Sequence, residues 1–236
     1  ASGQQVDYRT VRSNSVRSGM VTVGSQSARL LINVGATAAL ARLLTPQDFG
    51  LFGMVMTVTA FVMVFREVGL STATIQETNV SQNQISALFW INAGVGVGLT
   101  VLTASAARLV AWAFDEPRLV IALLQISPVF LLHGLACQHQ ALLKRSMHFS
   151  KLAAIDMWAA SMGAGAAIVA ATLGETVRAL ILQQLVTAVS SLALSWYWCR
   201  WRPAMTFARK EIGGLLRYGM HVAGFDLVNY FTRNLD

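Results

Sequence analysis

The stretch Leu40-Ala-Arg-Leu-Leu-Thr-Pro-Gln-Asp-Phe-Gly-Leu-Phe52 lies between two long apolar runs and indicates a sharp reversal of the chain. Thr45 can cap a helix N-terminus, and Pro46 fits the first helical turn because that position needs no N–H donor. Asp48 places a negative charge where the helix dipole favours one. The stretch therefore predicts a hairpin in which two hydrophobic helices meet at a membrane surface.

The composition is that of an integral membrane protein. The 236 residues are 55% hydrophobic and 12% charged, with a mean hydropathy of +0.53, whereas an ordinary soluble domain is roughly 25% charged. Cys137 and Cys199 lie in apolar segments without CxxC spacing, so neither a disulfide framework nor a zinc site is indicated.

The apolar segments are long enough to cross a bilayer, which takes about 20 helical residues. They predict an all-α polytopic fold with six spans and the start of a seventh near residue 214. The six lie at 19–44, 48–70, 84–107, 118–143, 151–173 and 176–199. Pro128 falls inside the fourth and predicts a kink there.

Small residues four apart allow membrane helices to approach closely. Gly94 and Gly98 have this spacing in the third span, and Ala159, Gly163 and Ala167 have it in the fifth. We expect both sets to lie at helix–helix contacts.

Residues 1–18 are polar and precede the first span. A cleaved signal peptide is the rival interpretation, because small residues such as Ala36 and Ala38 resemble a cleavage site. Arg29 and Asn33 interrupt the apolar core, and more hydrophobic segments follow, so we expect a cytoplasmic N-terminal segment followed by a true membrane helix.

The basic residues predict the orientation, because cytoplasmic loops are enriched in Lys and Arg. With the N-terminus in the cytoplasm, the opposite side holds four basic residues, Arg42, Arg108, Arg118 and Arg178. The cytoplasmic side then holds twelve: Arg9, Arg12, Arg17, Arg66, Lys144, Arg145, Lys151, Arg200, Arg202, Arg209, Lys210 and Arg217. This placement explains the net charge of +7 by topology and lipid contacts rather than by nucleic-acid binding.

The start of the seventh span repeats the start of the first. Arg17, Gly19-Met20 and Gly24 recur 200 residues later as Arg217, Gly219-Met220 and Gly224. The repeat predicts two related lobes, and transporters built in this way place their substrate between the lobes. We therefore expect a six-helix lobe at 19–199, a cytoplasmic linker at 200–213 and the start of a second lobe at 214–236.

The same offset aligns two polar stripes. Gln26, Arg29 and Asn33 share one helix face, and so do Asp226, Asn229 and Arg233. A central arginine facing lipid costs about 3 kcal/mol even on a mild insertion scale, so both stripes should face protein or a water-filled cavity. They are candidate substrate-cavity residues whose arginines would attract an anion. Alternatively, Arg29 and Arg233 pair with Asp156 and Asp226 as buried structural contacts.

Asp156 is also a candidate for ion coupling, although a salt bridge with Lys151 at the membrane interface is the simpler expectation. His133 and Cys137 share a helix face, but His139 points away from them and no carboxylate joins them, so we expect no metal. The chain has no Ser/His/Asp arrangement, no nucleotide-binding loop and no paired carboxylates. We expect no enzyme activity and no cofactor.

The wording of residues 40–52 resembles the signature after the first membrane helix of the polysaccharide transporter family. These proteins are bacterial flippases for lipid-linked O-antigen and exopolysaccharide units, within the multidrug/oligosaccharidyl-lipid/polysaccharide exporter superfamily. Four further stretches are similar to the same family: 65–71, 87–92, 138–144 and 229–236. The resemblance implies a MATE-like two-lobe bundle of twelve to fourteen helices, of which this chain supplies the first lobe and the start of the second.

The resemblance also implies a function. It favours translocation of undecaprenyl-pyrophosphate-linked oligosaccharides across the bacterial inner membrane by alternating access, with the lipid-linked sugar, membrane lipids and polysaccharide polymerase machinery as partners. A cation-coupled multidrug exporter of the same fold is an alternative, which the cationic Arg29 disfavours. A non-transporting membrane scaffold for polysaccharide enzymes is a third.

Overall fold

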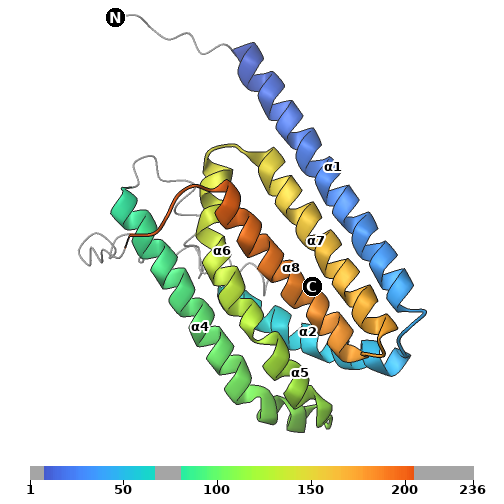
Figure 1. Ribbon diagram of the computed structural model, residues 1–236. Helices are drawn as coiled ribbons and strands as arrows, with labels where there is room; N and C mark the ends of the chain where they lie inside the picture. Colours follow the sequence, from blue (N-terminus) through green and yellow to red (C-terminus); the bar gives the residue numbers. More distant parts are fainter. Residues whose placement is uncertain (1–7, 67–80, 205–236) are drawn as a thin grey trace, which may run out of the picture.

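The computed structural model describes residues 8–66 and 81–204, and Figure 1 shows the helices that they form. The described helices are α1 (Tyr8–Leu40), α2 (Pro46–Arg66), α4 (Gln82–Ala113), α5 (Arg118–Ile126), α6 (Pro128–Arg145), α7 (Phe149–Thr172) and α8 (Val177–Trp198). No strand occurs among the described residues, so the predicted all-α class is confirmed.

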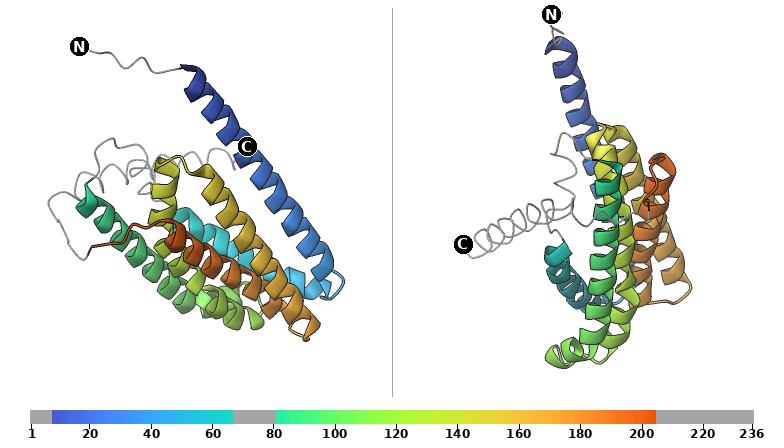
Figure 2. Two further views of the ribbon diagram at one scale, coloured as in Figure 1. Left: turned by 45° about the horizontal axis from the view of Figure 1, so that its top comes forward. Right: turned by 90° about the vertical axis from the view of Figure 1, so that its left-hand side faces the viewer.

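The long helices lie side by side in the order α4, α6, α8, α7, α1 (Figure 1). Helices α4 and α6 run antiparallel, as do α7 and α8, which a short turn joins (Figure 1). The neighbouring pairs α6–α8 and α7–α1 run parallel. Helix α2 contacts α5, α8 and α4 and lies on one side of this row, as Figure 2 shows edge-on. The described part of the chain is therefore one helical bundle with α1 at its edge.

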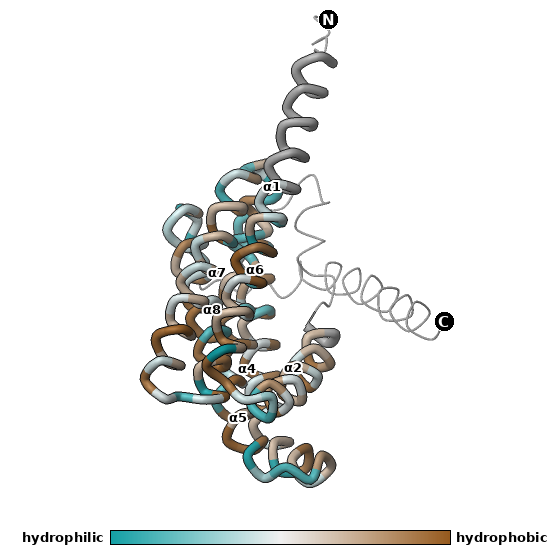
Figure 3. Tube along the Cα trace, turned by 90° about the vertical axis from the view of Figure 1, so that its right-hand side faces the viewer, coloured by the Kyte–Doolittle hydropathy of each residue, from teal (hydrophilic) through white to brown (hydrophobic). Residues whose placement is uncertain are grey.

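Four segments of the described chain are long and apolar enough to span a membrane. They are Gln82–Ala113, Arg118–Arg145, Phe149–Thr172 and Val177–Trp198, and Figure 3 shows the apolar residues along them. Each coincides with one of the predicted spans, and the chain is a multi-pass membrane protein.

Helix α1 is longer than the span predicted for it. Its 33 residues correspond to about 50 Å, against a hydrocarbon layer of about 30 Å. It begins at Tyr8, inside the segment expected to be a polar tail, and its N-terminal end projects beyond the bundle (Figure 1). The hydrophobicity of residues 19–44 carried no information on how far the helix extends on their N-terminal side.

The hairpin between α1 and α2 is formed as predicted. Thr45 precedes Pro46, the first residue of α2, and its hydroxyl lies 3.4 Å from the Asp48 amide nitrogen, which donates to it. The Asp48 carboxylate accepts from the Thr45 amide at 3.0 Å and from the Thr45 hydroxyl at 2.7 Å. This reciprocal cap supplies the polar groups that the first helical turn leaves unpaired.

The predicted kink at Pro128 is confirmed as a break between α5 and α6. Proline has no N–H for the carbonyl of Leu124, and the hydroxyl of Ser127 donates to that carbonyl instead, at 3.0 Å. On the other side, Thr100 of α4 donates to the carbonyl of Ser127 at 3.1 Å. Two hydroxyls therefore bind backbone carbonyls on either side of the break.

The predicted contact in α7 is confirmed: Ala159, Gly163 and Ala167 are buried, and Gly163 lies against α8.

Among the described residues, the prediction for α4 is wrong. A Cβ added at Gly94 or Gly98 would meet none of their atoms within 4 Å, whereas one at Gly96 would lie 2.9 Å from the carbonyl oxygen of Phe130. The contact with α6 is made by Gly96 and Gly134, because spacing defines a face of the helix without saying which face meets a neighbour.

Candidate functional site

The polar stripe predicted on the first helix is exposed on α1. Gln26, Arg29 and Asn33 are all exposed among the described residues. The adjacent face of α1, which includes Ala36 and Leu40, is buried, and Leu40 packs in a cluster with small residues of α7. The stripe therefore lies beside the α1–α7 contact and outside it.

Arg29 and Asp156 lie near each other across this contact. Both side chains are exposed, and the positive charge of Arg29 acts on the Asp156 carboxylate, as does that of Lys144 to a smaller extent. The expected salt bridge between Asp156 and Lys151 is absent from the ion pairs of the described residues. The edge of the bundle thus carries a cation and an anion at neighbouring positions, and neither is buried within this part of the chain.

The matching stripe of the seventh span, Asp226, Asn229 and Arg233, lies outside the described residues. Its position opposite Arg29 stays a prediction, and so does the role of both stripes in a substrate cavity. The domain limits at 199, 213 and 236 stay predictions in the same way.

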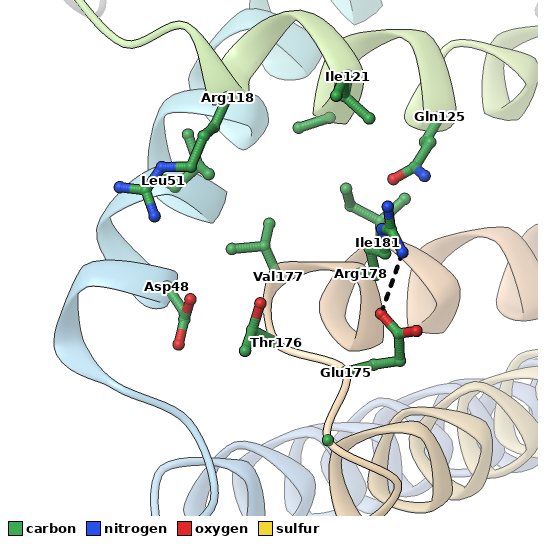
Figure 4. A pocket seen from close by; sticks show the side chains of 12 residues that line it. Asp48, Leu51, Arg118, Ile121, Gln125, Glu175, Thr176, Val177, Arg178 and Ile181 are labelled. Atoms are coloured by element: carbon green, nitrogen blue, oxygen red, sulfur yellow. Dashed lines mark ion pairs between the residues drawn. The ribbon is translucent and has the colours of Figure 1, made fainter.

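A cavity of about 310 Å³ lies at the end of the bundle where α2, α5 and α8 begin. Figure 4 shows Asp48, Arg118 and Arg178 around its opening, with apolar residues such as Ile181 at its wall. Charged and polar side chains from three elements therefore meet at this end.

The charges around this cavity are already paired. Arg178 lies 3.6 Å from Glu175, and Arg118 lies 3.0 Å from Glu116, whose hydrogen bond to that guanidinium lowers the pKa of the Glu116 carboxyl. Asp48 is committed to capping α2. With its cations neutralised by neighbouring carboxylates, the cavity is a poor site for an anion and serves as the junction of three turns.

The buried His139 belongs to an aromatic cluster that the sequence did not reveal. Its ring stacks on Trp196 of α8 at 4.5 Å between centroids, with Phe89 of α4 at 5.9 Å and Trp201 at 5.3 Å. The only signal in the sequence was that Trp196 and Trp201 lie close together at the end of α8. Among the described residues, no group of three or more His, Cys, Asp or Glu side chains is arranged to hold a metal.

Comparison with known protein families matches residues 39–236 to the polysaccharide biosynthesis proteins. The chain belongs to this family. Within it, the chain is 27% identical over 208 residues to the teichuronic acid biosynthesis protein TuaB of Bacillus subtilis, which aligns 87% of the chain.

Two further relatives in the family are similar. The lipopolysaccharide biosynthesis protein WzxC of Escherichia coli is 24% identical over 210 residues, which is 87% of this chain. The succinoglycan biosynthesis transport protein ExoT of Rhizobium meliloti is 26% identical over 193 residues, which is 82% of this chain. The aligned part covers 43% of TuaB, 43% of WzxC and 39% of ExoT, so the chain spans less than half the length of these relatives. No solved structure matches the chain.

Proposed function

We propose that this chain forms the first lobe of a flippase for polysaccharide biosynthesis. The substrate would be an oligosaccharide repeat unit linked to undecaprenyl pyrophosphate, carried from the cytoplasmic to the outer leaflet of a bacterial inner membrane by alternating access. Family membership and the named roles of the relatives in lipopolysaccharide and succinoglycan production support this proposal.

The exposed stripe of α1 is the observation that carries the mechanism. Gln26, Arg29 and Asn33 are exposed on α1, the helix at the edge of the bundle. Because a charged side chain facing lipid is costly, we propose that a second lobe and a water-filled cavity cover this face. The stripe would then form one wall of the route taken by the substrate.

Arginine suits the anionic part of such a substrate. The planar guanidinium binds two oxygens of a phosphate at once, and a lipid pyrophosphate offers several such oxygens. We propose that Arg29 attracts the pyrophosphate while Gln26 and Asn33 bind its polar surroundings. The proposed activity is transport with no covalent step, so the protein needs no cofactor and is not an enzyme.

The test uses the full-length gene in a bacterium whose own flippase is deleted. We expect wild type to restore labelled lipid-linked repeat units to the outer leaflet, and Arg29→Ala to lose this activity. Arg29→Lys should retain part of it, because lysine keeps the charge and loses the bidentate geometry. Arg108→Ala is the matched control, since Arg108 is an exposed arginine of α4 far from the stripe.

All variants are compared at equal amounts of membrane-inserted protein. Normal transport by Arg29→Ala would contradict the role given to the stripe, and absence of transport by wild type would contradict the flippase itself. Polysaccharide polymerase would be the partner that consumes the translocated units.

An exporter driven by a cation gradient is the second candidate. The exposed carboxylate of Asp156 favours it, and the positive charge of Arg29 disfavours it. Under that function the full-length protein would lower the accumulation of cationic dyes, and Asp156→Asn would abolish the effect. A flippase predicts no change in dye accumulation.

A further inference from the structure

The six residues that follow α8 run across the bundle to a distant helix. After α8 ends at Trp198, residues 199–204, which we call the strap, pass from the end of α8 to the N-terminal end of α4 (Figure 1). The backbone leaves the helix in an extended conformation at Cys199. The strap is the beginning of the segment expected to link the two lobes.

Four hydrogen bonds fasten the strap to the first turns of α4. The Trp201 indole donates to the Gln82 side-chain oxygen at 2.7 Å, and the Gln82 amide donates to the Arg202 carbonyl at 3.3 Å. The Ala204 amide donates to the Ser86 hydroxyl at 3.0 Å, and the Trp90 indole donates to the Ala204 carbonyl at 3.1 Å. Both ends of the strap's outer half are thus held by side chains of one helix.

Aromatic packing joins the strap to the interior as well. Trp201 meets Phe89 of α4 at 6.0 Å and His139 of α6 at 5.3 Å between ring centroids. Phe89 and His139 are almost fully buried, and Cys199 packs with Leu143 and Ile155 in a core cluster. Through Cys199 and Trp201 the strap therefore packs against four helices, while Arg200 and Arg202 are exposed.

Arg202 fixes the turn between α8 and the strap. One of its guanidinium nitrogens lies 3.2 Å, 3.0 Å and 2.9 Å from the carbonyl oxygens of Trp196, Cys199 and Trp201. The guanidinium carbon lies 5.4 Å from the centroid of the Trp196 ring. A cation at a helix C-terminus is favourable, and Pro203 further restricts the backbone of the strap.

We infer that the strap is a fixed arm of the first lobe, docked on α4 throughout the transport cycle. The inference rests on the proposed two-lobe flippase, because only a protein with moving lobes needs to keep part of its linker still. The first lobe then includes residues up to Ala204, so the linker expected at 200–213 is shorter by its first five residues. The chain that continues after Ala204 therefore starts beside the N-terminal end of α4 rather than at the end of α8.

A disulfide between α4 and the strap tests both the docking and the rigidity. Ser86→Cys and Ala204→Cys are combined in the full-length protein, because the Ser86 hydroxyl oxygen and the Ala204 amide nitrogen lie 3.0 Å apart and the two positions are within disulfide reach. A protease site in the exposed α6–α7 turn at Met147 separates the two cysteines. A linked pair then migrates as one band after cleavage and as two bands after reduction.

The matched control is Ser105→Cys with Ala204→Cys. Ser105 is exposed on the same helix α4 but lies about 28 Å further along it. The single variant Ala204→Cys reports any bond to the native Cys137 or Cys199. We expect nearly complete crosslinking of the Ser86 pair in membranes and none in the control.

Transport by the crosslinked protein then decides the role of the arm. We expect the oxidised Ser86 pair to move lipid-linked repeat units at the rate of its reduced form. Failure to crosslink would overturn the docking, and a loss of transport that reductant reverses would show that the strap must undock. If wild type transports and the reduced double variant does not, the two substitutions themselves disturb the arm's contacts. In that case Ala204→Cys alone must transport normally, or the fixed arm is overturned.

If wild type does not transport either, the flippase proposal fails, and the arm has no role in transport. The crosslink yield then still decides whether the strap is docked on α4.

Discussion

A single glycine sets how closely α7 approaches α8. A Cβ added at Gly163 would lie 2.7 Å from the carbonyl oxygen of Gln183 and would also collide with the Thr187 side chain. The Gln183 carbonyl belongs to the backbone of α8 and cannot turn aside as a side-chain end could. Gly165, two residues further along, is exposed and would place a Cβ in open space. Alanine substitutions at these two positions therefore distinguish the effect of tight helix packing from the effect of helix propensity within one helix.

We expect Gly163→Ala to destabilise the bundle by about 1–3 kcal/mol, the usual cost of overpacking a tight contact. Gly165→Ala should be neutral or slightly stabilising, because alanine is the better helix former and nothing opposes its methyl group. The melting midpoints of the two variants in detergent, measured on fluorescent fusions, provide the comparison. Equal midpoints would mean that α7 and α8 do not pack at Gly163.

At the scale of an element, the span from Arg118 to Arg145 is two helices rather than one. The backbone carbonyl of Leu124 has no helical N–H partner, because residue 128 is a proline and has no N–H to donate. Water cannot replace that donor inside a bilayer. The neighbouring Ser127 hydroxyl donates to it at 3.0 Å. Ser127, directly before the proline, thus supplies the hydrogen bond that the proline cannot donate.

A double-mutant cycle tests this pairing of Ser127 and Pro128. Ser127→Ala alone should cost about 1–3 kcal/mol, because it leaves the Leu124 carbonyl unsatisfied. In the Pro128→Ala background the same change should cost much less, since the alanine N–H can bind that carbonyl. The melting midpoints of the four proteins give the coupling energy. A Ser127→Ala effect that is the same in both backgrounds would contradict the pairing.

The sequence predicted the elements better than their contacts. Apolar length located the four spans between Gln82 and Trp198. Thr45 and Pro128 marked a helix start and a break, because caps and prolines act through local backbone chemistry. Gly94 and Gly98 were misassigned because the face that meets α6 depends on the position of α6, which local spacing does not contain. The cluster around His139 escaped prediction for the same reason, since it joins residues far apart in the sequence, such as Phe89 and Trp201.

For the candidate site, the sequence predicted which polar residues share one face of α1, and it did not predict which residues lie near that face. Gln26, Arg29 and Asn33 share an exposed side of α1 as their spacing required. The proximity of Arg29 to Asp156 depends on how α1 packs on α7, which the helical period of either helix alone does not fix. The cover proposed for the stripe lies outside the described residues.

At the scale of the whole molecule, the ends of the bundle differ in charge. The α1–α2, α4–α5 and α7–α8 turns lie at one end, and the α6–α7 turn and the strap lie at the other (Figure 1). The second end carries Lys144, Arg145 and Lys151 together with the strap's Arg200 and Arg202. Because basic residues near span ends are retained in the cytoplasm, this end should be the cytoplasmic one.

Reporter fusions to the chain at its turns test this orientation. Alkaline phosphatase joined after residue 43, 115 or 175 should be active, because those turns would lie outside the cytoplasm and this enzyme folds only there. Green fluorescent protein joined after residue 147 or 203 should fluoresce, because those positions would be cytoplasmic. The opposite pattern would place the N-terminus outside and reverse the direction of the proposed transport.

Replacing Lys144, Arg145 and Lys151 by glutamine should lower the activity of phosphatase fused after residue 175, since the positive charge that holds the preceding turn in the cytoplasm would be gone. Replacing Arg42, Arg108 and Arg118 in the same way removes three basic residues from the other end and should leave that activity unchanged. A loss of activity in both sets would show that these substitutions impair insertion in general, and a loss confined to the first would establish that the basic end of this bundle sets its orientation.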